Sequence, residues 1–251
     1  MNVACILAGG LGTRMQCAQT GPVPKQYYPL GDRPIVLWSI LAFDACHAID
    51  RLCIVAAADW HARIQSWLRQ AGVRTPFLFA LPGPERFDSA YHAIVALEPI
   101  CAPEDIVLFH DAARPLVSQR IIVENIALAQ TYGAVYTALP SQDTIIESQQ
   151  AALLSRIPAR HTVYQGQTPQ SFRYGLIAQA HAQFRANPSG AVTDDCTLVH
   201  RMGHPVVLCA GEKRNFKITT PEDYVFAQAL IAAQSNVKLN GMHSIHDESH
   251  R

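Results

Sequence analysis

The chain has 251 residues, of which 49% are hydrophobic and 16% are charged. This length and composition suffice for one sizeable hydrophobic core, and α/β folds of this size are often single domains, so we expect one domain. Twenty basic and twenty acidic residues cancel, which leaves no overall attraction for nucleic acid or for an anionic membrane surface, and any phosphate ligand must be held by local charges.

Seven cysteines are scattered along the chain and none forms a C-x-x-C pair, which argues against a disulfide framework and against a zinc site. No apolar stretch approaches the roughly 18 residues that a membrane-spanning helix needs, and no basic segment precedes the short apolar run at the N-terminus. We therefore expect a cytoplasmic protein.

Short apolar runs, typical of buried parallel strands, alternate with amphipathic stretches. The first run, residues 3–7, leads directly into glycines, and similar runs lie at residues 52–57, 77–81, 106–109 and 134–138. Apolar residues recur at helical spacing in residues 35–46, 61–71 and 88–97. This alternation predicts an α/β fold with a single doubly wound, mostly parallel, Rossmann-like sheet.

The alternation stops between about residues 142 and 167, where polar and β-branched residues predict an arm that projects from the core. A last strand near residues 206–209 and a helix that begins near Pro221 close the domain, because proline suits a first helical turn. We therefore place one domain at residues 1–234 and expect the polar, His-containing residues 235–251 to form a disordered tail.

The sequence LAGGLGTRMQ follows the first strand with three glycines and Arg14. Glycines allow backbone N–H groups to approach phosphate oxygens, and Arg14 adds a positive charge. An ordinary tight turn is the alternative. The dinucleotide-binding fingerprint does not fit because Met15 stands where it needs glycine, and a Walker loop does not fit because no G-K-[ST] follows.

The segment PKQYYPLGDRP holds Lys25 near the same strand end. Lys25 and Arg14 together suit a clamp on a triphosphate, which would neutralise charge on the transferring phosphorus and on the leaving pyrophosphate. The alternative is a solvated surface lysine. The two prolines of PVPK argue against it, because they restrict the loop in a way that a free surface side chain does not need.

The segment FHDAARPLV ends a strand that is otherwise apolar. A carboxylate at the carboxyl end of a buried parallel strand lies in the ligand crevice of such sheets, so Asp111 is the candidate magnesium ligand. Arg114 suits contact with a second anionic substrate, with a structural salt bridge as the alternative. His110 points to the opposite face if the strand continues, and we expect a structural role for it.

Basic residues also gather late in the chain, in GEKRNFKITTPEDY. Alternation in a short extended segment would put Lys213, Asn215 and Lys217 on one side. The pattern leaves open which side faces the crevice.

Taken together, the motifs LAGGLGTRM, PKQYYPL, HDAARP, DTI, QGQTPQSF, TDD and NFKITTPED occur in this order across residues 7–223. The series resembles the cytidylyltransferase family whose members activate 2-C-methylerythritol 4-phosphate or ribitol 5-phosphate. The resemblance covers nearly the whole chain outside the tail. It implies transfer of CMP from CTP to a polyol phosphate with magnesium, and release of pyrophosphate.

The resemblance also implies roles for individual residues. Arg14 and Lys25 correspond to the pair that stabilises the pentavalent phosphorus of the transition state, and Asp111 to the aspartate that binds magnesium. Arg114 corresponds to an arginine near the polyol phosphate, and Lys217 to a lysine at the polyol phosphate or the α-phosphate. Gly83 and Ser89 belong to the cytosine pocket, within an implied nucleotide site that comprises Leu7, Ala8, Gly9, Gly10, Gly12, Thr13, Gly83, Ser89 and Asp111.

The polyol site is implied to include Thr144 and Thr168. Family members dimerise through the arm, so the resemblance implies a homodimer in which Arg160 reaches the polyol phosphate of the neighbouring subunit. The implied partners are CTP, a polyol phosphate and a second copy of the chain, without nucleic acid or membrane.

The branch of the family is read from the arm and the segment after it. Tyr164 and QGQ before TPQ look more like the ribitol 5-phosphate enzymes, whereas HDAARP and TDDCTLVHRMGHP look at least as much like the methylerythritol branch. We expect ribitol 5-phosphate as the substrate, with 2-C-methylerythritol 4-phosphate as the alternative. Two rival hypotheses are a nucleotidyltransferase for sugar 1-phosphates with UTP or GTP, and a non-catalytic nucleotide-binding protein of the same fold.

Overall fold

The computed structural model describes residues 1–10, 23–149, 152–190 and 192–243, and these form an α/β fold around one central sheet. The seven strands lie in the order β5-β4-β1-β6-β8-β7-β9. Their bounds are β1 Asn2–Leu7, β4 Arg51–Val55, β5 Phe77–Ala80, β6 Ile106–Asp111, β7 Ala134–Pro140, β8 Tyr164–Arg173 and β9 Val207–Ala210. The sheet is parallel except for β8, which runs antiparallel to both of its neighbours. The expected doubly wound, mostly parallel sheet is confirmed.

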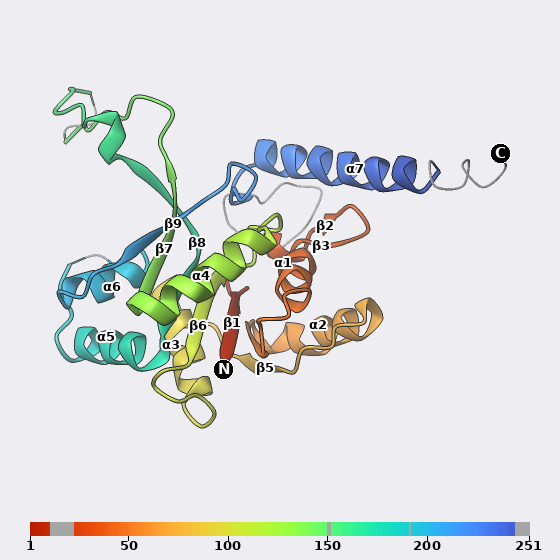
Figure 1. Ribbon diagram of the computed structural model, residues 1–251, viewed down its shortest axis with the longest axis horizontal. Coiled ribbons are helices and arrows are strands. Elements are labelled where there is room, and N and C mark those ends of the chain that lie inside the picture. Colours follow the sequence, from red (N-terminus) through yellow and green to blue (C-terminus); the bar gives the residue numbers. More distant parts are fainter. Residues whose placement is uncertain (11–22, 150–151, 191, 244–251) are drawn as a thin grey trace.

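Helices cover both faces of this sheet (Figure 1). On one face lie α1 (Ile35–Asp44), α2 (Ala58–Ala71) and α4 (Gln119–Tyr132), and on the other lie α3 (Arg86–Leu97), α5 (Tyr174–Ala186) and α6 (Asp195–Arg201). The alternation along β1 explains the two layers, since Ala4 and Ile6 pack in the first core and Val3 and Cys5 in the second. Both cores are apolar, so the strands hold uninterrupted apolar runs at residues 3–7 of β1, 52–55 of β4 and 106–109 of β6.

A third, smaller core joins the end of the chain to the hairpin of β2 (Pro29–Leu30) and β3 (Arg33–Pro34). Helix α7 (Pro221–His243) packs Ala227 and Ile231 against this hairpin. The helix was expected to start at Pro221, and it does. It continues to His243, and the disordered tail predicted for residues 235–251 stays a prediction. Residues 244–251 lie outside the described residues.

The predicted arm leaves the sheet between β7 and β8 and projects from the body (Figure 1, green to teal). An antiparallel bridge joins Glu147 to Arg156, and a 3-10 turn, Arg160–Thr162, leads back into β8. Residues 164–167, which were assigned to the arm, belong to β8. Large apolar side chains are exposed on the arm, among them Ile146, Leu153 and Leu154.

No helix in the described ranges is long and apolar enough to cross a membrane. The cysteines within the described ranges are free thiols.

A buried polar junction ties α4 to β7 and β8. The Asn125 amide donates to the hydroxyl oxygen of Thr137 at 2.9 Å and accepts from the Ser171 hydroxyl at 2.9 Å. Thr137 in turn donates to the carbonyl of Pro169, the residue after Thr168. All three polar side chains are fully buried. The junction therefore fixes the strand that carries Thr168 into the site.

Replacing Asn125 with alanine should lower the free energy of unfolding by about 2–4 kcal/mol, because it leaves a small cavity and removes a partner from both Ser171 and Thr137. Chemical denaturation monitored by circular dichroism measures this. Gln130→Ala, an exposed change on the same helix, is the control and should stay within about 0.5 kcal/mol of the parent. Equal stability of the two variants would contradict the structural importance of the junction.

Candidate active site

A cleft of about 510 Å³ opens at the carboxyl ends of β1 and β6. This is the edge at which the strand order reverses, since β1 is flanked by β4 on one side and by β6 on the other. Ligands of doubly wound sheets bind at such switch points. Its lining includes Leu7, Gly9, Gly10, Lys25, Gln26, Gly83, Arg86, Ser89, Asp111 and Lys217.

The end of β1 supplies one wall of the cleft. Leu7, Gly9 and Gly10 line it, while Ala8 is buried beneath them. A Cβ atom on Gly9 would lie 2.2 Å from the Cβ atom of Pro82, so only glycine fits there. Three further predicted members of the nucleotide site, Gly12, Thr13 and Arg14, lie outside the described residues.

Gln26, which the sequence analysis did not single out, ties this wall to the lysine turn. Its amide donates to the carbonyl oxygens of Ala8 at 2.6 Å and Gly10 at 2.9 Å. The neighbouring Lys25 ammonium donates to the carbonyl of Ile218 at 2.7 Å, directly after Lys217. The glycine segment, the lysine turn and the segment before α7 are thus held together.

The opposite wall is the start of α3. The backbone N–H of Gly83 donates to the Ser89 hydroxyl at 3.1 Å, and that hydroxyl donates to the carbonyl of Glu85. A Cβ atom on Gly83 would lie 2.1 Å from the Cβ atom of Asp88, so the chain cannot pass here with a larger residue. Gly83 and Ser89 therefore lie together in the cleft, where the resemblance placed the cytosine pocket.

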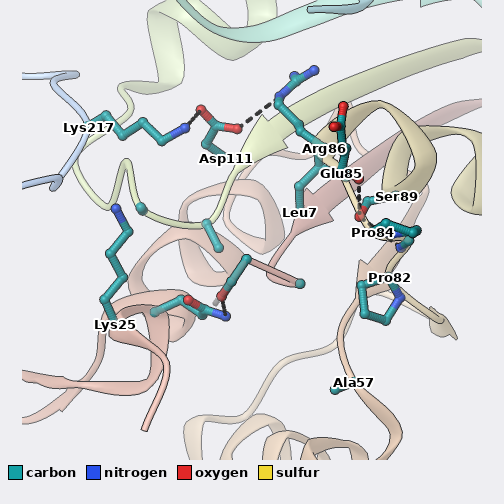
Figure 2. A pocket seen from close by; sticks show the side chains of 16 residues that line it. Leu7, Lys25, Ala57, Pro82, Pro84, Glu85, Arg86, Ser89, Asp111 and Lys217 are labelled. Carbon is teal, nitrogen blue, oxygen red and sulfur yellow. Dashed lines mark hydrogen bonds and ion pairs between the residues drawn. The ribbon is translucent and has the colours of Figure 1, made fainter. Parts of the chain in front are cut away.

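Asp111 ends β6 at the centre of a charged cluster. One carboxylate oxygen lies 3.0 Å from the Lys217 ammonium and 3.6 Å from Nε of Arg114, and the other lies 3.3 Å from Nε of Arg86. In Figure 2, Lys217 and Arg86 approach Asp111 from opposite sides. Burial disfavours the charged carboxylate, but Lys217, Arg86 and Arg114 outweigh it and lower the pKa of Asp111 far below its usual value. Asp111 is therefore ionised at neutral pH.

Arg114 forms the salt bridge that was one alternative for it, and its contact with a second anionic substrate stays a prediction. It forms the salt bridge with Asp111, and it also lines the two cavities next to the cleft. Its guanidinium donates to the carbonyls of Asn215 at 2.8 Å and Gly166 at 3.3 Å, and burial lowers its pKa. Arg114 is thus held rigidly by the chain at the edge of a second cavity.

His110 is structural, as expected. It is fully buried and contacts Phe43 of α1, on the face of β6 opposite Asp111. Its Nε2 atom lies 3.1 Å from the carbonyl of Arg114 and its Nδ1 atom 3.1 Å from the hydroxyl of Thr168. Because a carbonyl only accepts, Nε2 carries the proton and Nδ1 accepts from Thr168. The Thr168 oxygen also accepts from the Asp111 N–H at 3.0 Å, so His110 helps to fix the site from behind.

A second cavity of about 320 Å³ adjoins the cleft, and Lys217 lines both. Lys213 and Arg114 also line it. The expectation that Lys213, Asn215 and Lys217 share one side was wrong, because the segment turns and is not extended. Asn215 is fully buried and donates to the carbonyl of Thr168 at 2.8 Å.

Two predicted residues of the polyol site lie elsewhere in the described chain. Thr144 and Arg160 are exposed on the arm, where the Arg160 guanidinium donates to the Thr144 hydroxyl at 3.1 Å. Neither lines the cleft or the adjoining cavities of its own chain within the described residues. Thr168 does line a cavity next to Asp111.

The sequence analysis missed Arg86 and its partner Asp195. Arg86 donates to Asp111 and, at 2.7 Å, to the fully buried Asp195 at the start of α6. Both residues stand in segments with motif character, ERFDS and TDD, but no local pattern pairs residues this far apart in the chain.

The sequence model of the family described as 2-C-methyl-D-erythritol 4-phosphate cytidylyltransferase (IspD) matches residues 2–233. The chain belongs to this family. IspD enzymes are cytidylyltransferases, so the chain is a nucleotidyltransferase that acts on a polyol phosphate. Both rival hypotheses, a sugar 1-phosphate nucleotidyltransferase and a non-catalytic binding protein, are thereby set aside.

Solved structures of IspD proteins share the fold. The 4-diphosphocytidyl-2C-methyl-D-erythritol synthase from Anaerococcus prevotii is 27% identical, with a TM-score of 0.78 over 92% of this chain and 96% of that chain. The 2-C-methyl-D-erythritol 4-phosphate cytidylyltransferase from Thermus thermophilus is 29% identical, with a TM-score of 0.68 over 91% of this chain and 98% of that chain. The enzyme of the same name from Francisella tularensis is 25% identical, with a TM-score of 0.75 over 90% and 97%.

The buried His110 should make stability depend on pH. Burial lowers its pKa from 6.5 to about 4, so between these values the unfolded chain binds a proton that the folded chain does not. Stability is then complete above the unfolded pKa and is lost as the pH falls. Between about pH 7 and about pH 4 the unfolding free energy of the parent should fall by about 3 kcal/mol more than that of His110→Gln, as measured by urea denaturation. Parallel pH profiles for the two proteins would contradict this.

Proposed function

We propose that this protein transfers CMP from CTP to 2-C-methyl-D-erythritol 4-phosphate and releases pyrophosphate, a step of isoprenoid synthesis. The observation that carries the proposal is a nucleotide-sized cleft that shares Asp111, Arg86 and Lys217 with one cavity beside it. Such an arrangement would allow two phosphorylated substrates to meet at one set of charges. The family match supports this substrate, and the expected preference for ribitol 5-phosphate finds no support in it.

The reaction we propose is an in-line displacement. An oxygen of the acceptor phosphate forms a new bond to the α-phosphorus of CTP, while the bond from that phosphorus to the bridging oxygen breaks and pyrophosphate leaves. A phosphate monoester has a second pKa near about 6, so the nucleophile is already ionised at neutral pH and needs no strong base. Positioning and charge neutralisation by Lys25, Lys217 and, by resemblance, Arg14 supply the acceleration.

The described residues suit a magnesium ion only if a triphosphate supplies further ligands to it. Within the described ranges no cluster of three or more His, Cys, Asp or Glu side chains is built to hold a metal. Asp111 is a single ionised carboxylate at the cleft, which suits Mg²⁺ because this ion commonly takes one or two carboxylates and completes its shell with phosphate oxygens and water. When bound there, magnesium would neutralise phosphate charge; Asp111 is the residue we propose to hold it.

The arm supports a homodimer in which each chain completes the site of the other. Arg160 and Thr144 are exposed on the arm and away from the cleft of their own chain, and exposed apolar side chains such as Ile146 and Leu154 accompany them. An apolar surface of this kind on a projecting segment is typical of a partner interface. A partner's arm would bring the Arg160 guanidinium to the acceptor phosphate.

Pyrophosphate release with CTP and magnesium tests the substrate assignment. With methylerythritol 4-phosphate and ribitol 5-phosphate supplied in parallel at equal concentration, we expect a preference of at least about 100-fold in kcat/KM for the former, since it is the substrate that the family match supports. Lys25→Ala is the control and should lose about 100- to 1000-fold in kcat with a smaller change in CTP affinity. A preference for ribitol 5-phosphate would overturn the assignment.

Mixed dimers test the shared site. An Arg160→Ala chain paired with a Lys25→Ala chain leaves one of the two sites with both residues intact, so the heterodimer should recover up to about half of the parent activity. Each homodimeric variant alone is the control. Heterodimers isolated with two different affinity tags that stay as inactive as the homodimers would argue against a contribution of Arg160 across the interface.

A further inference from the structure

Asp195 lies at the start of α6, entirely out of reach of solvent, and has no place in the reaction described above. One of its oxygens accepts from Nη1 of Arg86 at 2.7 Å, and the other lies 3.1 Å from Nε2 of His181. Its backbone N–H donates to the Gln170 side chain at 3.1 Å. It lines neither the cleft nor the adjoining cavities within the described residues. Asp195 therefore acts on the site only through its partners.

His181 holds Asp195 from behind. The imidazole is fully buried on α5 and stacks on Phe87, with ring centroids 4.8 Å apart and planes at 3°. Burial disfavours the charged form of Asp195, but Arg86 and the hydrogen bond from His181 outweigh it and lower the pKa of this carboxyl. A charged Asp195 is thus built into the second core at a fixed position.

Arg86 divides its donors between two carboxylates. The bond to Asp195 is 2.7 Å long, whereas the contact of Nε with Asp111 is 3.3 Å. The shorter, charge-assisted bond is the stronger one. Without it the guanidinium would have Asp111 as its single anionic partner and would compete with any cation for the same oxygens.

We propose that Asp195 is a positioning residue that draws Arg86 toward α6 and so keeps the Asp111 carboxylate available to a metal ion at the nucleotide phosphates. The proposal rests on the proposed function, because it concerns how CTP and its metal bind. It predicts a signature that loss of structure would not give. Without the Asp195 charge, Arg86 is left with Asp111 and the nucleotide phosphates as its anionic partners, so Mg²⁺ binds less well while CTP without metal binds at least as well.

The test measures CTP binding by titration calorimetry without acceptor, first in EDTA and then over a series of Mg²⁺ concentrations. We define the Mg²⁺ requirement as the Mg²⁺ concentration that gives half of the full change in the Kd for CTP. For Asp195→Asn we expect this requirement to rise about ten-fold, and the Kd for CTP in EDTA to stay equal or fall. Glu98→Gln removes the same charge from the exposed far end of α3 and should change neither value. Weaker CTP binding in EDTA, or an unchanged Mg²⁺ requirement, would overturn the proposal.

A double-mutant cycle asks whether Asp195 acts through Arg86. In an Arg86→Gln background, Asp195→Asn should change the Mg²⁺ requirement by less than about two-fold, because no guanidinium is left to redirect. A ten-fold effect that persists there would refute the role of Arg86. If Asp195→Asn does not fold, Arg86→Gln alone decides. It should lower the Mg²⁺ requirement and raise the Kd for CTP in EDTA. A rise of both values, or a fall of both, refutes the proposal.

The binding readouts also separate this inference from the proposed function. If the parent binds CTP and Mg²⁺ but releases no pyrophosphate with methylerythritol 4-phosphate, the substrate assignment fails while the Asp195 result still stands. If the parent turns over but Asp195→Asn leaves metal and CTP binding unchanged, the inference alone fails.

Discussion

One buried, ionised carboxylate organises the charged site of this protein. Asp111 ends β6 where three cations converge, and its negative charge holds Arg86, Arg114 and Lys217 at 3.3, 3.6 and 3.0 Å from its oxygens. A buried carboxylate without partners would be costly, so these cations are what keep Asp111 charged. A phosphate ligand meets a site that is already assembled and positive.

The surrounding fold fixes the positions of Asp111 and its three cations. These cations come from three separate parts of the chain: Arg86 from the start of α3, Arg114 from the turn after β6 and Lys217 from the segment before α7. Uncharged side chains behind them form hydrogen bonds with the backbone of the site. His110 binds the carbonyl of Arg114, and Thr168 accepts from the N–H of Asp111. Buried networks of this kind are stable only when their members find partners, which limits how far the site can shift.

A site made of fixed charges also suits a reaction that needs no general base. In the reaction we propose, the acceptor phosphate is ionised on its own, so the protein would need charges at fixed positions and not a base with a tuned pKa. The positions and signs of these charges therefore matter most for the reaction. Arg86 is shared between Asp111 and Asp195. His181, which stacks on Phe87 in the second core, holds Asp195 in place.

The sequence by itself determined the sheet, its helices and the residues that follow strand ends, because these depend on local periodicity and on the fixed edge at which parallel strands end. Lys25, Asp111 and the Gly9–Gly10 segment were predicted for this reason, and the roles of Gly83 and Ser89 came with the family resemblance. Only the tertiary structure decided which distant groups meet. Arg86 pairs with Asp195, and Asp195 pairs with His181, because α5 packs against both α3 and α6. The burial of Asn215 needs a turn that alternation does not encode. Long-range packing, which no local pattern specifies, decides these contacts.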